Sequence, residues 1–177
     1  DCFIAEQKPG AAVPLLEKAL PLQPHSLETK GRLLASFAYL DGGSPEAPSA
    51  KMKEVLDSLK DKPSCLGEAW LTAGEACDRM RHFVLAEKCY RAALVLLPQH
   101  IYVRGHLGLS LMRLGEEPEA AKLLDESFKL DPFNVRVKNM LEVLDVLQGY
   151  AIVETDHFVL KFDRGQNELL AQYAADV

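Results

Sequence analysis

The sequence repeats itself between Leu66 and Asn134 with a period of 34 residues. Three pairs of positions recur at this distance without an insertion: Gly74 and Gly108, Ala86 and Ala120, Pro98 and Pro132. A fixed period of this size is typical of architectures in which each repeat is one supersecondary unit stacked on its neighbours. The prolines fit the ends of helices, because proline cannot donate the helical backbone hydrogen bond. The repeat therefore predicts a stacked, solenoid-like chain.

The order of large and small residues within one unit is more specific than the period. The first copy reads Trp70-x₂-Ala73-Gly74-x₂-Cys77, then Ala86-x₃-Tyr90-x₂-Ala93, then Pro98. This order resembles the tetratricopeptide-repeat family, and the resemblance covers most of the 177 residues. It implies an all-α fold, a right-handed α-solenoid whose unit is a pair of antiparallel helices. Gly74 and Ala86 would lie where the two helices cross, beside Tyr90.

The remainder of residues 1–148 fits around the two clean repeats, 65–99 and 100–133. Residues 1–25 match the end of a partial repeat. Residues 26–64 match a degenerate repeat whose five surplus residues fall in the Gly-, Pro- and Ser-rich segment 42–49, and Ser26 is a suitable N-cap for its first helix. Residues 134–148 form one more helix with no partner, which we expect to cap the apolar end of the stack.

The periodicity changes after Gly149. Phe158, Leu160 and Phe162 alternate with other residues, which is typical of a β-strand, and Asn167 is a possible N-cap for a short helix after it. A strand and half a helix cannot bury themselves, so residues 149–177 are predicted to begin a truncated α/β domain. Because an uncovered strand edge invites pairing, we expect residues 152–162 to be poorly ordered or paired with a second copy in a dimer.

The segment Val153-Glu154-Thr155-Asp156-His157-Phe158, leading into a Leu-rich helix, resembles the opening of the peptidase-MA-like (gluzincin) domain. In bacterial proteins this zinc metallopeptidase domain often follows tetratricopeptide repeats. The resemblance implies a longer protein in which a His-Glu-x-x-His zinc site lies further along the chain. That motif is not in this sequence, so the chain itself is predicted not to be an enzyme, and no catalytic residue can be assigned.

Composition argues against several other classes. A net charge of −6 without clustered Lys and Arg argues against a nucleic-acid surface, and no apolar run approaches the ~20 residues that span a membrane. The five histidines are dispersed and there is no Cys-x-x-Cys, so no metal or cofactor is predicted. We expect Cys77 and Cys89 to be free, buried thiols. The alternative is a disulfide bridge or a shared metal ion between them, with His82 nearby. The sequence does not indicate a compartment.

The family resemblance places the binding surface on the concave face, which the first helix of each pair lines. The expected ligand is a peptide, a partner protein or another domain of the same chain; a purely structural spacer is the remaining alternative. Projected onto this sequence, the candidate binding residues are Glu68, Leu71, Glu75, Arg79, Tyr102, Leu109, Met112, Arg113, Arg136 and Asn139.

Two features qualify that surface. One subclass of the family clamps the acidic C-termini of heat-shock chaperones with Lys and Asn, but Leu71 and Glu75 stand where those residues would be needed. We therefore do not expect a carboxylate clamp on this face. Leu109 and Met112 have an alternative role, which is to pack against the neighbouring helix pair.

Overall fold

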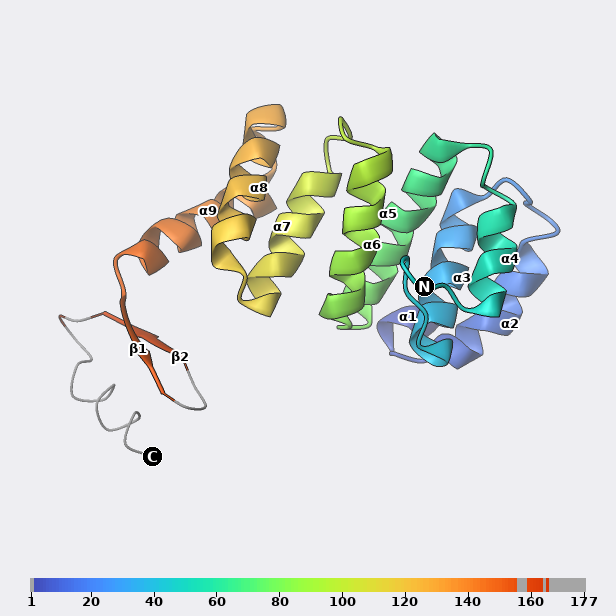
Figure 1. Cartoon of the computed structure of the whole chain (residues 1–177), viewed down its shortest axis with the longest axis horizontal. Coiled ribbons are helices and arrows are strands. Elements are labelled where there is room, and N and C mark those ends of the chain that lie inside the picture. Colours follow the sequence, from blue (N-terminus) through green and yellow to red (C-terminus); the bar gives the residue numbers. More distant parts are fainter. Residues whose placement is uncertain (1, 156–158, 164, 166–177) are drawn as a thin grey trace.

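The helices stand side by side in an elongated row, with a short β-hairpin beyond one end of it (Figure 1). This computed structural model describes residues 2–155, 159–163 and 165. The expected helical solenoid with a short C-terminal strand segment is confirmed, whereas the helix predicted from Asn167 lies outside the described residues. No helix in the described ranges is both long and apolar enough to cross a membrane.

The row begins with two helices that match the partial repeat, α1 (Cys2–Ala5) and α2 (Pro9–Ala19). Three helix pairs follow: α3 (Leu27–Asp41) with α4 (Ala50–Asp57), α5 (Pro63–Arg79) with α6 (Phe83–Leu96), and α7 (Val103–Leu114) with α8 (Glu117–Leu130). The described chain then continues through α9 (Val135–Gln148), β1 (Ala151–Glu154) and β2 (Val159–Phe162). We call α3, α5 and α7 the first helices and α4, α6 and α8 the second helices. The surface made by the first helices and α9 is the first-helix face.

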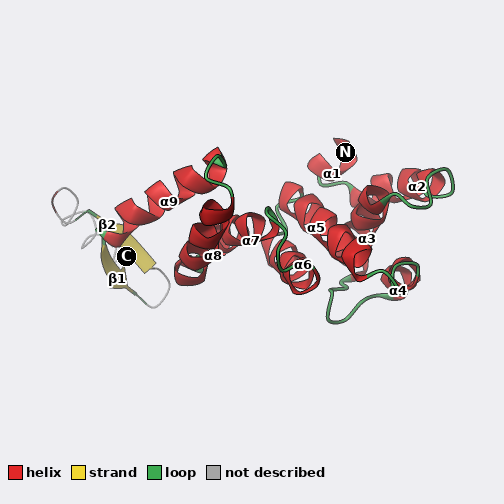
Figure 2. Cartoon of the chain, turned by 90° about the horizontal axis from the view of Figure 1, so that it is seen from above, coloured by secondary structure: helices red, strands yellow, loops and turns green. Residues whose placement is uncertain are grey.

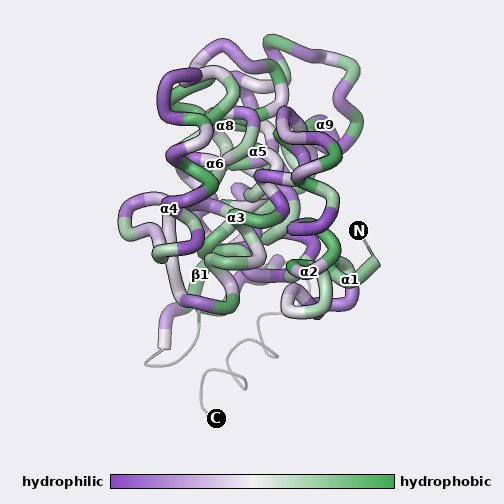
Figure 3. Tube along the Cα trace, turned by 90° about the vertical axis from the view of Figure 1, so that its right-hand side faces the viewer, coloured by the Kyte–Doolittle hydropathy of each residue, from purple (hydrophilic) through white to green (hydrophobic). Residues whose placement is uncertain are grey.

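Figure 2 views the row from above and shows α5 and α9 toward one side, with α4 and α6 toward the other. Hydrophobic and hydrophilic stretches are interspersed along the chain (Figure 3), as expected for helices in which one stripe packs inward. The buried apolar residues form one continuous core from Ile4 in α1 to Leu144 in α9. The helix ends follow local chemistry: Ser26, the predicted N-cap of α3, accepts a hydrogen bond from the backbone N–H of Thr29 at 3.1 Å.

The close helix crossings implied by the repeat are present. A Cβ atom placed on Gly74 would lie 2.5 Å from Cε1 of Tyr90, and one placed on Gly108 would lie 2.7 Å from Cγ of Leu124. Ala86 and Tyr90 are completely buried. The glycines therefore leave room for a large side chain from the second helix to lie directly against the backbone of the first.

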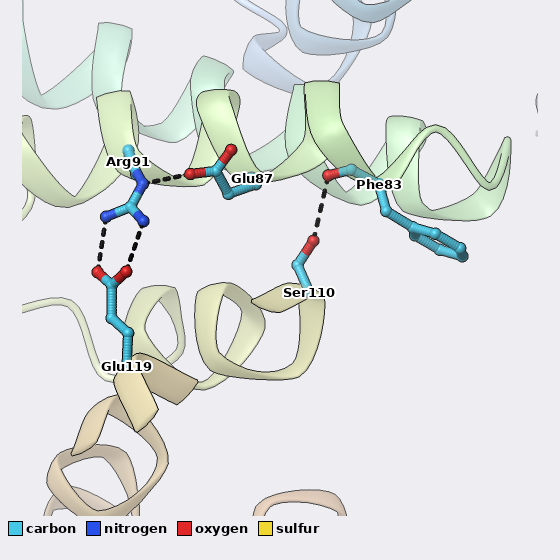
Figure 4. Close-up of polar contacts among 5 residues, drawn as sticks. All are labelled: Phe83, Glu87, Arg91, Ser110 and Glu119. Carbon is cyan, nitrogen blue, oxygen red and sulfur yellow. Dashed lines mark hydrogen bonds and ion pairs between the residues drawn. The ribbon is translucent and has the colours of Figure 1, made fainter. Parts of the chain in front are cut away.

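Polar contacts also join successive pairs on the side of the second helices (Figure 4). The guanidinium of Arg91 in α6 donates to both carboxylate oxygens of Glu119 in α8, at 2.7 and 2.8 Å, and also to Glu87 on its own helix. Arg91 holds the pKa of the Glu119 carboxyl below its usual value. In the same region the hydroxyl of Ser110 in α7 donates to the backbone carbonyl of Phe83, at 3.4 Å.

The C-terminal hairpin differs in one respect from the sequence expectation. The strand at 159–162 was expected to lack a partner within the chain, but β1 and β2 pair with each other in antiparallel register, with Ile152 opposite Lys161. The β-branched residues of 152–153 supply that pairing partner. Lys161 also forms an ion pair with Glu117 at the start of α8. Dimerisation through an outer strand edge stays a prediction.

The helix α9 packs on α7 and α8 through a narrow stripe. Val137 and Leu144 are buried in this contact, whereas Val135, Val143 and Val146 are exposed. The role of α9 as a cap, and the start of a second domain after it, stay predictions.

The first prediction concerns the crossing at Gly74. Gly74→Ala should lower the free energy of unfolding by about 1–3 kcal/mol, because the new methyl group overlaps the rigid ring of Tyr90. Gly10→Ala is the matched control, since Gly10 lies in α2 with its nearest neighbour 3.9 Å away. It should raise stability by about 0.5–1 kcal/mol, the usual gain for Ala in a helix. Urea unfolding of the three proteins measures both effects, and two shifts of the same sign would contradict this account of the crossing.

Candidate functional site

A charged groove lies on the first-helix face between α3 and α5. It has a volume of about 250 Å³ and is lined by Glu28, Arg32, Thr72, Glu75, Ala76 and Arg79. The lining residues recur one helical turn apart on each helix, so their side chains project toward the same groove. Glu28 and Arg32 form an ion pair along α3. The groove therefore presents both signs of charge over a floor made by Thr72 and Ala76.

Next to this groove, carboxylates on α5 pair with cationic or titratable side chains that belong to the following repeat. Three such pairs follow one another along α5: Glu68 with His100 at 3.4 Å, Glu75 with His106 at 3.6 Å, and Asp78 with Arg113 at 3.0 Å. The last two join α5 directly to α7, whereas His100 precedes α7 in the connecting turn. We call these three pairs the α5–α7 seam.

The centre of the seam is partly buried, since the side chains of His106 and Glu75 are 27% and 36% exposed. His106 stacks on the ring of Tyr90, with 5.5 Å between ring centroids and an interplanar angle of 24°. The Tyr90 hydroxyl donates to Asp78 at 3.1 Å, and burial raises the pKa of Tyr90 far above its usual value. Burial also lowers the pKa of His106, assisted by the charges of Arg136 and His100 and opposed by Glu75 and Asp78. The neutral imidazole is therefore the favoured form at neutral pH.

The structure brings some of the ten candidate residues together. Glu75 and Arg79 line the groove. Glu68 pairs with His100, and the His100 ring lies edge-on to the ring of Tyr102, with 5.9 Å between centroids. Arg113 lies over the ring of Phe83. Tyr102 is half exposed.

Other candidates lie apart from the groove or are not accessible. Leu71 and Leu109 are only 7% and 8% exposed, and Met112 packs partly buried against the core. The alternative packing role stated for Leu109 and Met112 is thus the one that their burial favours. Arg136 and Asn139 are exposed on α9, away from α3 and α5.

The groove also contains two polar residues that sequence reasoning missed, Arg32 and Thr72. The histidines of the seam were missed too, because they were judged by their spacing on one helix. The signal that was available is the separation from their partners: Glu75 and His106 are 31 residues apart and Asp78 and Arg113 are 35 apart. Opposite charges separated by about one repeat length fall on neighbouring first helices.

Among residues 2–155, 159–163 and 165, no group of three or more His, Cys, Asp or Glu side chains is placed to hold a metal ion. Cys77 and Cys89 are free, buried thiols rather than a bridge, and contact between them together with burial raises the pKa of Cys89 well above its usual value. His82 instead lies edge-on to Tyr39, with 5.6 Å between ring centroids.

Comparison with known proteins agrees with the repeat fold. No protein-family model matches the chain. Its sequence is 29% identical over 162 residues to the tetratricopeptide repeat-containing protein trd-1 of Caenorhabditis elegans; the alignment covers 88% of this chain and 20% of trd-1, so the chain spans about a fifth of that relative. The fold is similar to the crystal structure of MamA, with a TM-score of 0.52 and 19% identity over 84% of each chain. Neither similarity concerns the peptidase-like domain suggested by residues 153–163, which stays a prediction.

The second prediction concerns His106. Because its folded-state pKa lies below the unfolded value near 6.5, the neutral form stabilises the fold above that pH, and this contribution is lost as pH falls through the lowered pKa. The free energy of unfolding should therefore decrease between about pH 7.5 and pH 5.5, and it should decrease less in His106→Gln. Urea unfolding at both pH values tests this. A pH-dependent loss of the same size in both proteins would show that His106 is not responsible.

Proposed function

The chain is a tetratricopeptide-repeat solenoid, and from that premise we propose that it is an interaction scaffold whose first-helix face binds an extended segment of a partner protein. The observation that carries this proposal is the groove between α3 and α5, which contains the predicted residues Glu75 and Arg79. Its volume of about 250 Å³ is below the roughly 300–1,000 Å³ typical of small-molecule sites. That size suits one or two side chains of a peptide better than an enclosed substrate.

The charges of the groove favour a particular kind of peptide. Glu28 and Glu75 stand with Arg32 and Arg79, so a segment that carries both acidic and basic residues is matched better than a uniformly acidic tail. This agrees with the absence of Lys and Asn at positions 71 and 75. Beyond the seam, Tyr102 offers an exposed aromatic surface, the type of side chain that commonly anchors binding.

The bound segment belongs either to a separate protein or to another part of a longer chain. A segment from elsewhere in a longer chain agrees with the comparison, because this chain spans about a fifth of the length of trd-1. The similarities to trd-1 and MamA give no support to a zinc peptidase, so the scaffold is the function that we propose.

The third prediction tests the groove. Peptides selected from a displayed random library against the immobilised chain should lose affinity about tenfold or more for Arg79→Glu, which replaces one exposed contact by the opposite charge. The melting temperature should fall by no more than a few degrees, because Arg79 is exposed in the last turn of α5, where an acidic residue and the nearby Glu75 cost little. Fluorescence anisotropy with single selected peptides measures the affinity.

Two further variants complete this test. Tyr102→Ala should weaken the same peptides, whereas Lys122→Glu makes the same charge change at an exposed position of α8 and should leave affinity unaltered. A library that yields no binding peptide would favour a structural spacer. Peptides that bind wild type and Arg79→Glu equally would place recognition elsewhere.

A further inference from the structure

A second pocket, separate from the groove, lies between the first turn of α3 and the first turn of α5, beside the connections that precede these two helices. It has a volume of about 290 Å³ and is lined by Pro24, His25, Leu27, Lys30, Ser58, Leu59, Lys62 and Cys65. Two lysines and one histidine contribute to this lining, and no carboxylate does. A pocket lined by basic side chains without an acidic one is unexpected in a chain whose net charge is −6.

Lys30 is the unusual member of this pocket. Its side chain belongs to a residue only 7% exposed, yet among the described residues its ammonium has no hydrogen-bond or ion-pair partner. The ammonium is not among the buried polar atoms that lack a partner, so it reaches the surface of the pocket and is open to a carboxylate from outside. Glu17 and Glu54 line an adjoining groove on another side of Lys30, but neither pairs with it.

The third helix pair of the same chain shows what Lys30 lacks. Lys30 follows Pro24 by six residues, as Arg104 follows Pro98, so the two cations hold equivalent places in their repeats. Arg104 is satisfied there, because it donates to the carboxylate of Glu126 in α8 at 3.1 Å and to the backbone carbonyl of Pro98.

The residue equivalent to Glu126 is Ser58. Buried or partly buried residues share one spacing in α4 with the turn after it and in α8, which aligns the two segments with a shift of 68 residues: Met52 with Ala120, Val55 with Leu123, Leu56 with Leu124, and Leu59 with Ser127. The same shift aligns Ser58 with Glu126. The hydroxyl of Ser58 donates to the carbonyl of Val55 at 2.6 Å and leaves the ammonium of Lys30 without an acceptor.

The first turn of α5 adds to the positive potential of the pocket. Its N-cap residue is Lys62, whose side chain makes no capping hydrogen bond, and Pro63 begins the helix. The N–H groups of a first turn have no acceptor within the helix, and the helix dipole is positive at this end. Lys62 and Cys65 bring this helix end to the pocket wall.

We propose that this pocket binds the carboxylate of an aspartate or glutamate side chain from a partner peptide, with Lys30 as its principal contact. The incoming carboxylate takes the place that Glu126 holds beside Arg104. The site is distinct from the groove between α3 and α5, and it does not depend on the function proposed for that groove.

Amide NMR spectra of the chain, titrated at constant ionic strength, test the proposal. The probes are a capped hexapeptide of alternating Glu and Ala, its Gln counterpart, and inorganic phosphate. The Glu peptide should shift the amides of Leu27, Ser64 and Cys65 saturably, and the Gln peptide should not. Lys30→Met, which keeps the buried aliphatic stem, should weaken this binding about tenfold or more, the usual order for a lost charged hydrogen bond. Lys60→Met removes an exposed neighbouring charge outside the pocket lining and is the matched control, with affinity unchanged.

Ser58→Glu supplies the carboxylate within the chain itself. It should raise the melting temperature and abolish binding of the Glu peptide, whereas its neutral counterpart Ser58→Gln should retain binding. Lys30→Met should not lower the melting temperature, because it keeps the buried aliphatic stem and removes no hydrogen bond or ion pair within the described residues; a clear decrease would instead assign Lys30 to the fold and overturn the proposal. Equal binding of the Glu peptide to wild type and Lys30→Met, no saturable shift with that peptide, or tighter binding of phosphate would overturn it as well.

Discussion

The contact between Gly74 and the ring of Tyr90 sets the geometry on which the other features of the central repeats depend. With no side chain at Gly74, α5 and α6 can approach until an aromatic ring touches the backbone, and Gly108 and Leu124 repeat this arrangement in the next pair. The pairs then present their first helices at a regular interval. Side chains on successive turns of α5 can reach α7 only when the first helices are spaced in this way. The α5–α7 seam is therefore a consequence of the close crossing of α5 and α6.

The repeat was readable from the sequence because its signals are local. Glycine, alanine and proline at fixed distances report helix crossings and helix ends, and Ser26 reports a cap, since each acts on residues close by in the chain. The pairing of β1 with β2 was missed because a strand pattern gives the face of each residue but does not name the partner strand.

The binding residues were harder to predict for a related reason. Projection from the repeat gives the side of the helix, and two of the residues that it selected, Glu75 and Arg79, line one groove. It does not give depth, so Leu71 and Leu109 were selected although their neighbours cover them. It also takes each repeat as equivalent to the next. The surroundings of Lys30 differ from those of Arg104 because Ser58, the C-cap of α4, stands where α8 has Glu126. The longer connection after α3 makes this equivalence difficult to see in the sequence.

Asp78 connects interactions that otherwise belong to separate units. One of its carboxylate oxygens accepts from Tyr90 within its own helix pair, and the other accepts from Arg113 in the following pair. In a linear array, stability divides into a contribution from each repeat and a coupling between neighbours. The Asp78 carboxylate contributes to both energies. If the pair of α7 and α8 unfolds, Asp78 loses Arg113, and its contact with Tyr90 in the pair of α5 and α6 is altered as well. We therefore expect the central part of the solenoid to unfold as one cooperative block, in which opening at one end propagates across α5 instead of stopping at the boundary between repeats.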